Sequence, residues 1–185
     1  MKKTLLALMT MTALLTNAQQ RFPYQNASLP VEQRVKDLLS RMTPEEKAGQ
    51  LNQLNGGAFT GPALNDAGQN EKMQMVKDGK VGSLLNVVGV ADTRAIQQEA
   101  MKSRLQVPLL FGYDVIHGYK TIFPIPLAEA CSWDLPGIEK NSSVSASEAA
   151  AAGIHWTFAP MCDVTNDPRW GRIMEGAGED PYLAG

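Results

Sequence analysis

The chain contains 185 residues, of which 44% are hydrophobic and 19% charged, and its formal net charge at pH 7 is -2. This composition is typical of a globular protein. It has no stripe of Lys and Arg and no cluster of aromatic with basic side chains, which excludes nucleic acid as the expected partner. Only two cysteines are present, Cys131 and Cys162. A disulfide between them stays open, but two buried unpaired thiols are the simpler expectation.

Residues 1–18 carry the pattern of a signal peptide. Lys2 and Lys3 precede an apolar run from Thr4 to Leu15, and Thr16–Ala18 offers small residues for a signal peptidase. The run is shorter than the roughly 20 apolar residues that span a bilayer. We therefore expect cleavage near Ala18, a periplasmic or secreted protein, and no stable membrane insertion afterwards. A buried N-terminal helix is the alternative, but it does not explain the paired lysines.

Helical patterns open the remaining chain. After a lead-in at residues 19–30, the apolar spacing over Leu29–Met42 predicts an amphipathic helix. Thr43–Glu46 has an N-cap, a proline at the first helical position and a capping-box glutamate, which predicts a second helix through about Leu54. The next segments are expected to be a loop over Ala58–Asn70 and a short helix over Lys72–Lys77.

Three short apolar runs then alternate with helical patterns. The runs are typical of strands buried on both faces: Val81–Val88, Val107–Gly112 and Ile154–Pro160. The predicted helices are Thr93–Arg104, Leu127–Ser132 and a longer one that is capped by Asp134 and runs to Ala152, before Gly153. Buried strands separated by helices indicate βαβ units and a parallel sheet.

Polar side chains follow two of the predicted strands. They are Tyr113, Asp114 and His117 after one strand, and Asp163, Asn166, Asp167, Arg169, Trp170 and Arg172 after the next. Ligands bind at the carboxyl edge of a parallel sheet, where such loops converge. The sequence therefore predicts the functional site on these two segments.

Several long segments resemble glycoside hydrolase family three, in the order expected for that family. The matching segments are RVKDLLSRMTPEEK at Arg34–Lys47, VPLLFGYDVIHG at Val107–Gly118, TIFPIPLAE at Thr121–Glu129, GIHWTFAP at Gly153–Pro160, DPRWGR at Asp167–Arg172 and EGAGEDP at Glu175–Pro181. The resemblance implies an α/β fold, a (β/α)8 TIM-barrel-like N-terminal domain, within a β-glucosidase of the periplasmic type.

The resemblance also implies substrate-binding roles for Asp114 and Arg172. In that family, the matching residues bind hydroxyls of the sugar that is cleaved off. The nucleophile and the acid/base belong to family segments downstream of the last match, so no catalytic residue is expected in this chain. The implied reaction is retaining hydrolysis of terminal non-reducing β-D-glucosyl residues, with a β-glucoside or β-linked oligosaccharide as substrate and without a cofactor or metal.

The residue chemistry suits sugar binding but leaves structural alternatives open. An ionised Asp114 can accept from sugar hydroxyls, and Arg172 can donate in a fixed fork. Alternatively, Asp114 is a loop cap, and Arg172 forms an ion pair with Glu175, Glu179 or Asp163.

Other candidates have simpler structural explanations. Trp170 can stack on a sugar but suits a structural role in a tight turn. His117 and His155 lack metal-site spacing, which favours structural histidines. The acidic residues Glu175, Glu179 and Asp180 could pass for a general acid and base. However, Asp180 with Pro181 predicts a helix start, and the family resemblance places catalysis elsewhere.

The chain is shorter than a complete barrel. About 250 residues form a (β/α)8 barrel, and the helix predicted at Asp180 would be interrupted at Gly185. Residues 31–185 are therefore expected to be a partial, truncated TIM-barrel-like domain. Three functional classes follow: part of a β-glucosidase, or of a β-xylosidase or β-N-acetylhexosaminidase of the same family; a non-catalytic sugar-binding module; and a non-functional remnant.

Overall fold

The computed structural model describes residues 22–56 and 66–185 and divides the chain into two compact units, which meet between Thr43 and Pro44. The predicted signal peptide lies outside the described residues. The first unit contains the 3-10 helix η1 (Pro23–Gln25) and the helix α2 (Val31–Arg41). Arg34 Nε donates to the carbonyl of Tyr24 at 2.8 Å, and the Tyr24 N–H donates to Asp37 at 3.2 Å. These bonds hold η1 against α2.

The first predicted helix is confirmed, but its apolar face is not buried within its own unit. Val31, Val35 and Leu39 are 66%, 45% and 47% exposed. The polar side of α2 carries an ion pair between Asp37 and Arg41. Amphipathic spacing therefore formed the helix as predicted, with Met42 buried but Val31, Val35 and Leu39 left exposed.

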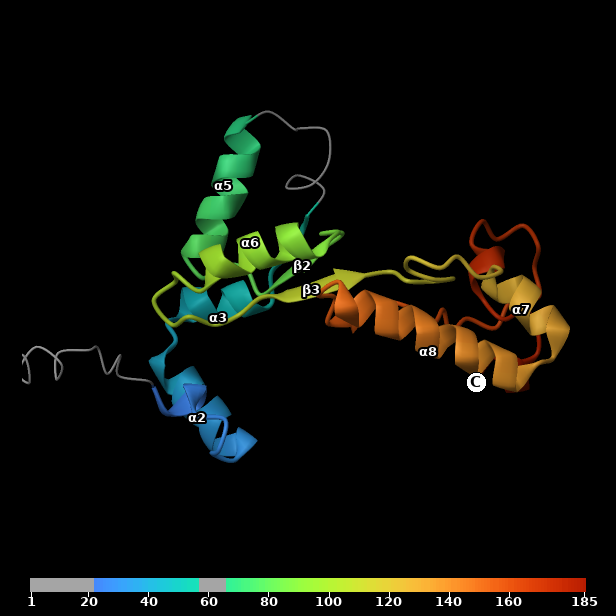
Figure 1. Ribbon diagram of the computed structural model, residues 1–185, viewed down its shortest axis with the longest axis horizontal. Helices are drawn as coiled ribbons and strands as arrows, with labels where there is room; N and C mark the ends of the chain where they lie inside the picture. Colours follow the sequence, from blue (N-terminus) through green and yellow to red (C-terminus); the bar gives the residue numbers. More distant parts are fainter. Residues whose placement is uncertain (1–21, 57–65) are drawn as a thin grey trace, which may run out of the picture. The chain divides into compact units, whose positions relative to one another are not determined.

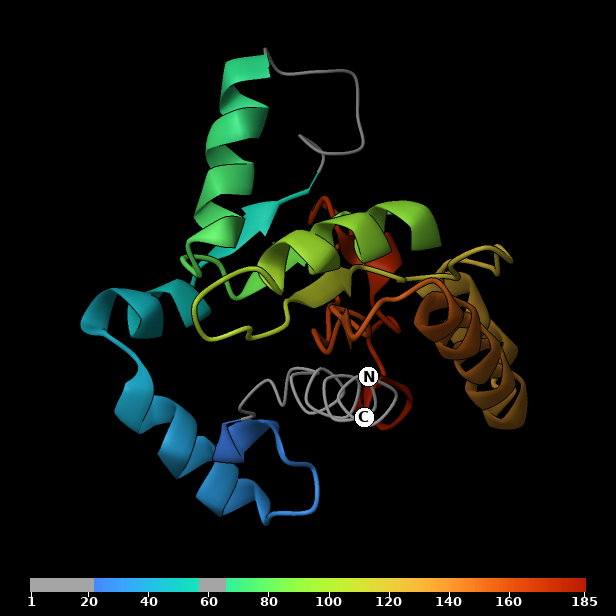
Figure 2. The ribbon, with the colours of Figure 1, turned by 60° about the vertical axis from the view of Figure 1, so that its left-hand side comes forward.

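The second unit is a parallel sheet with helices between its strands. In chain order, its elements are α3 (Pro44–Gln50), β1 (Gln53–Asn55), α5 (Asp66–Lys77), β2 (Ser83–Leu85), α6 (Val90–Ala100), β3 (Leu110–Tyr113), α7 (Pro126–Ser132), α8 (Leu135–Ala151), β4 (Trp156–Thr157), η2 (Ile173–Glu175) and α9 (Pro181–Ala184). The strand order is β1-β2-β3-β4, and every pairing is parallel. Figures 1 and 2 show α6 alongside β2 and β3.

The core of this unit lies where β2 and β3 meet the surrounding helices. Its members come from α5, β2, α6, β3, α8 and the segments that flank the strands: Val76, Val81, Leu84, Val87, Ile96, Ala100, Leu109, Phe111, Ala149 and Ile154. Leu84 is fully buried and Phe111 is 1% exposed. β2 is buried at Ser83 and Leu84, as predicted for a strand covered on both faces. β3 is buried at Phe111 and Gly112, but Leu110 at its start is 51% exposed, so the prediction of burial on both faces does not hold for all of β3.

Two predictions at the start of this unit were wrong. The second helix ends at Gln50, not near Leu54, because Gln53–Asn55 pairs with Ser83–Leu85 as β1. The loop predicted up to Asn70 is helical from Asp66 onward, and the rest of that loop lies outside the described residues. A three-residue strand shows too little periodicity to be separated from a helix by sequence alone.

The later predictions were closer. β2, β3 and β4 lie inside the three predicted runs or extend one residue beyond them. β4 has only two residues and both are exposed, so the prediction of a strand buried on both faces was wrong for β4, which forms the edge of the sheet after β3. α6 begins three residues earlier than predicted and ends at Ala100. The Asp134 side chain accepts from the Gly137 N–H at 3.1 Å and caps α8 as predicted. α8 ends at Ala151, before Gly153, whose φ is +92°. Among the described residues, no helix is both long and apolar enough to cross a membrane.

Gly82 provides a test of the packing between α3 and β2. A Cβ at this position would lie 2.2 Å from the Gln50 carbonyl oxygen and 2.7 Å from its carbon. Because both atoms belong to the backbone, we predict that Gly82→Ala lowers the free energy of unfolding by about 1–3 kcal/mol, measured by urea denaturation. Gly171→Ala is the matched control, since no atom lies within 4 Å of its added Cβ. Equal losses in the two variants would contradict this packing.

Candidate functional site

Asp114 lies at the carboxyl edge of the sheet, directly after β3. Tyr113 pairs with Thr157 of β4, and the Thr157 hydroxyl donates to the Asp114 carbonyl at 3.0 Å. The Asp114 side chain is exposed, and its carboxylate accepts no hydrogen bond from residues 22–56 or 66–185. The backbone of Asp114 is therefore fixed by the sheet while its carboxylate stays available to a ligand.

The loop after Asp114 is held by a glutamate of α8. Glu148 accepts from the N–H groups of Lys120 and Thr121 at 2.9 and 2.7 Å, and from the Thr121 hydroxyl at 2.6 Å. The bonds from the Thr121 hydroxyl and amide lower the pKa of the Glu148 carboxyl, as do the amide and charge of Lys120, against an opposing effect of desolvation. No sequence signal pointed to Glu148, because its partners lie 27 and 28 positions away.

The segment after β4 forms a turn that separates the two arginines of the DPRWGR motif. Arg169 binds Asp167 through Nε and Nη2, at 2.9 and 2.7 Å. The Trp170 N–H donates to the Asp167 carbonyl at 3.2 Å, and the Trp170 side chain is half-buried. Arg169 is thus engaged locally, and Arg172 extends from the end of the turn.

Arg172 forms an ion pair with Glu175, which was one of the structural alternatives for this residue. Its Nε donates to the two Glu175 oxygens at 3.1 and 3.0 Å, and its Nη2 donates to Glu175 Oε2 as well. The Glu175 hydrogen bonds and charge raise the pKa of the guanidinium; the negative charges of Asp114 and Asp163 add to that effect, while desolvation opposes it. Asp114 and Arg172 therefore lie close enough for their charges to interact.

A cavity of about 420 Å³ lies beside these two residues. Its mostly apolar lining includes Val115, Thr157, Met161 and Glu175, together with residues of α7, α8 and α9. Val115 follows Asp114 in the chain, and Met161 and Glu175 both contact Arg172. Neither Asp114 nor Arg172 is in the lining itself, so the cavity contains neighbours of the two candidates but neither candidate.

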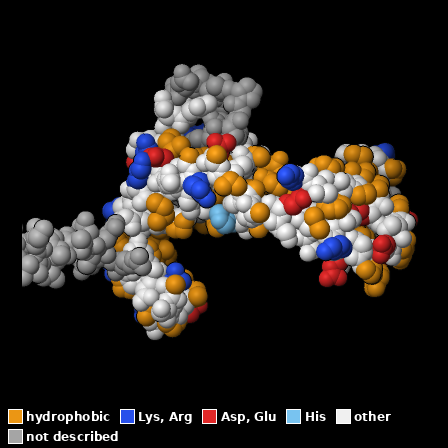
Figure 3. All heavy atoms as spheres, viewed as in Figure 1, with side chains coloured by type: hydrophobic (Ala, Val, Ile, Leu, Met, Phe, Trp, Pro, Cys, Tyr) orange, Lys and Arg blue, Asp and Glu red, His pale blue; other side chains and the backbone are white. Residues whose placement is uncertain are grey.

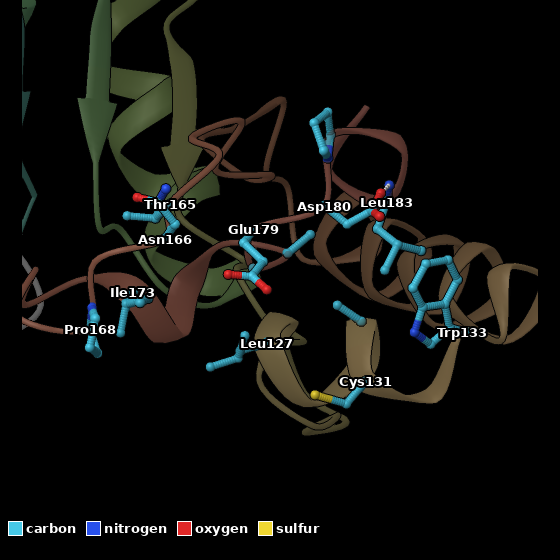
Figure 4. A pocket seen from close by; sticks show the side chains of 14 residues that line it. Leu127, Cys131, Trp133, Thr165, Asn166, Pro168, Ile173, Glu179, Asp180 and Leu183 are labelled. Carbon is cyan, nitrogen blue, oxygen red and sulfur yellow. Dashed lines mark hydrogen bonds between the residues drawn. The ribbon is translucent and has the colours of Figure 1, made fainter.

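A second cavity, of about 760 Å³, lies between α7 and the segment that leads into α9 (Figure 4). It is lined by Cys131, Trp133 and Glu179, among others, but by neither predicted sugar-binding residue. The face drawn in Figure 3 carries hydrophobic side chains over the region of α7 and α8. This cavity does not include Asp114 or Arg172, so we place the candidate site by its polar chemistry and not by cavity volume.

The two cysteines are unpaired, and each of the two histidines contacts a backbone group. Cys131 and Cys162 are both unpaired, as expected, but both are exposed, so the prediction of buried thiols was wrong. His117 Nδ1 lies 3.2 Å from the Phe123 carbonyl, and His155 Nδ1 accepts from the Phe111 N–H at 3.2 Å. Across the residues that the structure describes, no group of three or more His, Cys, Asp or Glu side chains is arranged to hold a metal.

A parallel sheet with crossover helices, and with charged loops at its carboxyl edge, defines a TIM-barrel-like α/β domain of the kind found in enzymes. The chain belongs to glycosyl hydrolase family 3: residues 43–185 match the description "Glycosyl hydrolase family 3 N terminal domain". This finding confirms both the resemblance of the sequence segments and the predicted fold class.

Three relatives illustrate the similarity. The chain is 47% identical to the periplasmic β-glucosidase of Salmonella typhimurium, over 80% of this chain and 19% of that protein. It is 30% identical to the periplasmic β-glucosidase/β-xylosidase of Dickeya chrysanthemi, over 87% of this chain and 28% of that protein. Crystal structures of the β-glucosidase of Listeria innocua, with glucose or laminaribiose, match with a TM-score of 0.72 and 45% identity over 83% of this chain and 22% of that chain. The chain thus spans between about a fifth and three tenths of the length of these relatives.

The Glu148 contact predicts a pH-dependent loop. Because folding lowers the pKa of this carboxyl, its stabilising contribution is present above the usual glutamate pKa of 4.5 and is lost as pH falls through the lower folded value. We expect the amides of Lys120 and Thr121 to lose protection from hydrogen exchange over that acidic range. Glu148→Gln should lose this pH dependence, and Glu139→Gln, an exposed change on the same helix, should retain it. Protection that is insensitive to pH in the unsubstituted chain would contradict the prediction.

Proposed function

We propose that this chain forms part of the sugar-binding site of an exported β-glucosidase that releases terminal non-reducing β-D-glucosyl residues. The observation that carries the proposal lies at the carboxyl edge of the sheet. There the exposed Asp114 carboxylate accepts no hydrogen bond from residues 22–56 or 66–185, and Arg172, on the segment after β4, keeps Nη1 without a partner among the same residues. Membership of the glycosyl hydrolase family and the β-glucosidase relatives support the reaction class.

The two side chains complement the groups on a pyranose. Sugar hydroxyls both donate and accept, so the carboxylate of Asp114 can accept from one hydroxyl while Arg172 donates to its neighbour. The complexes of the Listeria innocua β-glucosidase with glucose and laminaribiose support a glucoside as the ligand. In the retaining reaction, these bonds would position the ring and tighten as it distorts.

The sugar could instead be a xyloside, which is the second candidate. The relative from Dickeya chrysanthemi carries both names, β-glucosidase and β-xylosidase. The β-N-acetylhexosaminidase alternative lacks such support among these relatives.

Export is supported by the relatives as well. The proteins from Salmonella typhimurium and Dickeya chrysanthemi are both named periplasmic. Together with the signal-peptide pattern of residues 1–18, these names favour a periplasmic or secreted protein.

We further propose that neither catalytic carboxylate is among the residues of this sequence. A retaining pair requires one carboxylate free to attack and one carboxyl that is protonated to act as an acid. Glu175 is instead bound to Arg172 by hydrogen bonds that lower the pKa of its carboxyl, which disfavours the protonated form that an acid needs. In this proposal the chain positions the sugar and another segment performs the chemistry.

Substitutions at Asp114 and Arg172 test the binding role. We use a chimera in which residues 43–185 replace the matching segment of the Salmonella typhimurium relative. Loss of one hydrogen bond to a charged group costs about 1.5–3 kcal/mol, so Asp114→Asn and Arg172→Ala should each lower kcat/KM on 4-nitrophenyl β-D-glucoside about 10- to 100-fold. Asp92→Asn and Arg94→Ala, exposed changes on α6, are matched controls. Unchanged kcat/KM in both site variants would remove them from the glucose site.

A further inference from the structure

The contact between Arg172 and Glu175 uses one edge of the guanidinium almost completely. Nε lies 3.1 and 3.0 Å from the two carboxylate oxygens, and Nη2 donates to Oε2. Nη2 also lies 3.4 Å from the Met161 sulfur. Within residues 22–56 and 66–185, Nη1 has no partner in the chain, so its two N–H groups are the donors that remain for a ligand.

Glu175 is itself held firmly by the backbone. Its N–H donates to the Arg172 carbonyl at 3.0 Å, which closes η2 between the two paired residues. The next residue, Gly176, forms a parallel bridge with Met161, in the segment that follows β4. The Glu175 carboxylate is partly buried, with 30% of the side chain exposed, against 55% for Arg172. The ion pair is therefore attached, through the bridge between Gly176 and Met161, to the segment that follows β4.

The charges around Arg172 differ in how they act on it. Glu175 makes direct hydrogen bonds, whereas Asp114 and Asp163 act on the guanidinium only through their charge. A side chain as long as arginine has several rotatable bonds, and fixing one edge of its planar group limits the directions in which the other edge can point. Among these three carboxylates, Glu175 alone has the contact needed to fix that orientation.

We propose that Glu175 is a positioning residue, which holds Arg172 by the Nε–Nη2 edge so that Nη1 is presented to the sugar hydroxyls that Asp114 also binds. This proposal rests on the sugar-binding role of Arg172. Glu175 itself neither touches the sugar nor transfers a proton. An unpaired Arg172 would still be charged, but it would spend part of its time in orientations that do not reach the ligand.

The test is a double-mutant cycle in the chimera defined above. A residue that acts through Arg172 has no effect once Arg172 is gone. We expect Glu175→Gln to lower kcat/KM about 10-fold, Glu175→Asp to restore part of that loss, and Arg172→Ala to lower kcat/KM about 100-fold. The double variant Glu175→Gln/Arg172→Ala should match Arg172→Ala alone. Glu179→Gln, an exposed carboxylate of the same segment, is the matched control and should leave kcat/KM unchanged.

The outcomes separate the positioning role from the binding role. If Arg172→Ala is harmless, the sugar-binding role of Arg172 fails. Suppose that Arg172→Ala lowers kcat/KM. If Glu175→Gln then leaves kcat/KM unchanged, or if the double variant loses the product of the two single fold-losses, only the positioning role of Glu175 is overturned. Circular dichroism melting of each variant identifies a loss of folding. Should Glu175→Gln fail to fold, the same cycle with Glu175→Asp gives the decision, because a shorter carboxylate keeps the charge but shifts the guanidinium.

Discussion

Parallel pairing of β3 with β4 is the constraint on which the candidate site depends, because it brings together segments 43 positions apart in the chain. The His155 N–H donates to the Phe111 carbonyl at 2.8 Å, and the Phe158 N–H donates to Tyr113 at 3.2 Å. Phe111 is buried in the core and Tyr113 packs against it. The position of Asp114 relative to the segment that ends at Arg172 is therefore anchored in the hydrophobic core, and not in the loops themselves.

The sequence predicted the central strands and helices because their signals are local. The apolar runs around β2 and β3, the cap at Asp134 and the turn at Gly153 each lie within a few residues of the structure they specify. β1 was missed because its pairing partner, Ser83–Leu85, is remote in sequence and its three residues alone resemble the end of a helix. Exposure of the two thiols was missed because burial depends on packing that composition does not encode.

The candidate site was predictable in its residue types but not in its contacts. Asp114 and Arg172 follow strands and belong to motifs, so their place in the chain pointed to the carboxyl edge. The sequence offered three acidic partners for Arg172, and the structure selects Glu175 for the hydrogen bonds while Asp163 acts through charge alone. Glu148 was not predicted at all, since nothing near it in the chain indicates that it binds the loop at Thr121.

The charges at this edge also bear on the kind of ligand that fits. One guanidinium lies among the negative charges of Glu175, Asp114 and Asp163. An anionic ligand such as a phosphate would meet more negative than positive charge here, and like charges that must be desolvated repel strongly. A neutral polyol has no such penalty, because its hydroxyls donate to the carboxylates and accept from the arginine. In the proposed site, Nη1 of Arg172 would supply the donors and the Asp114 carboxylate the acceptors, a combination that suits the hydroxyls of a sugar ring.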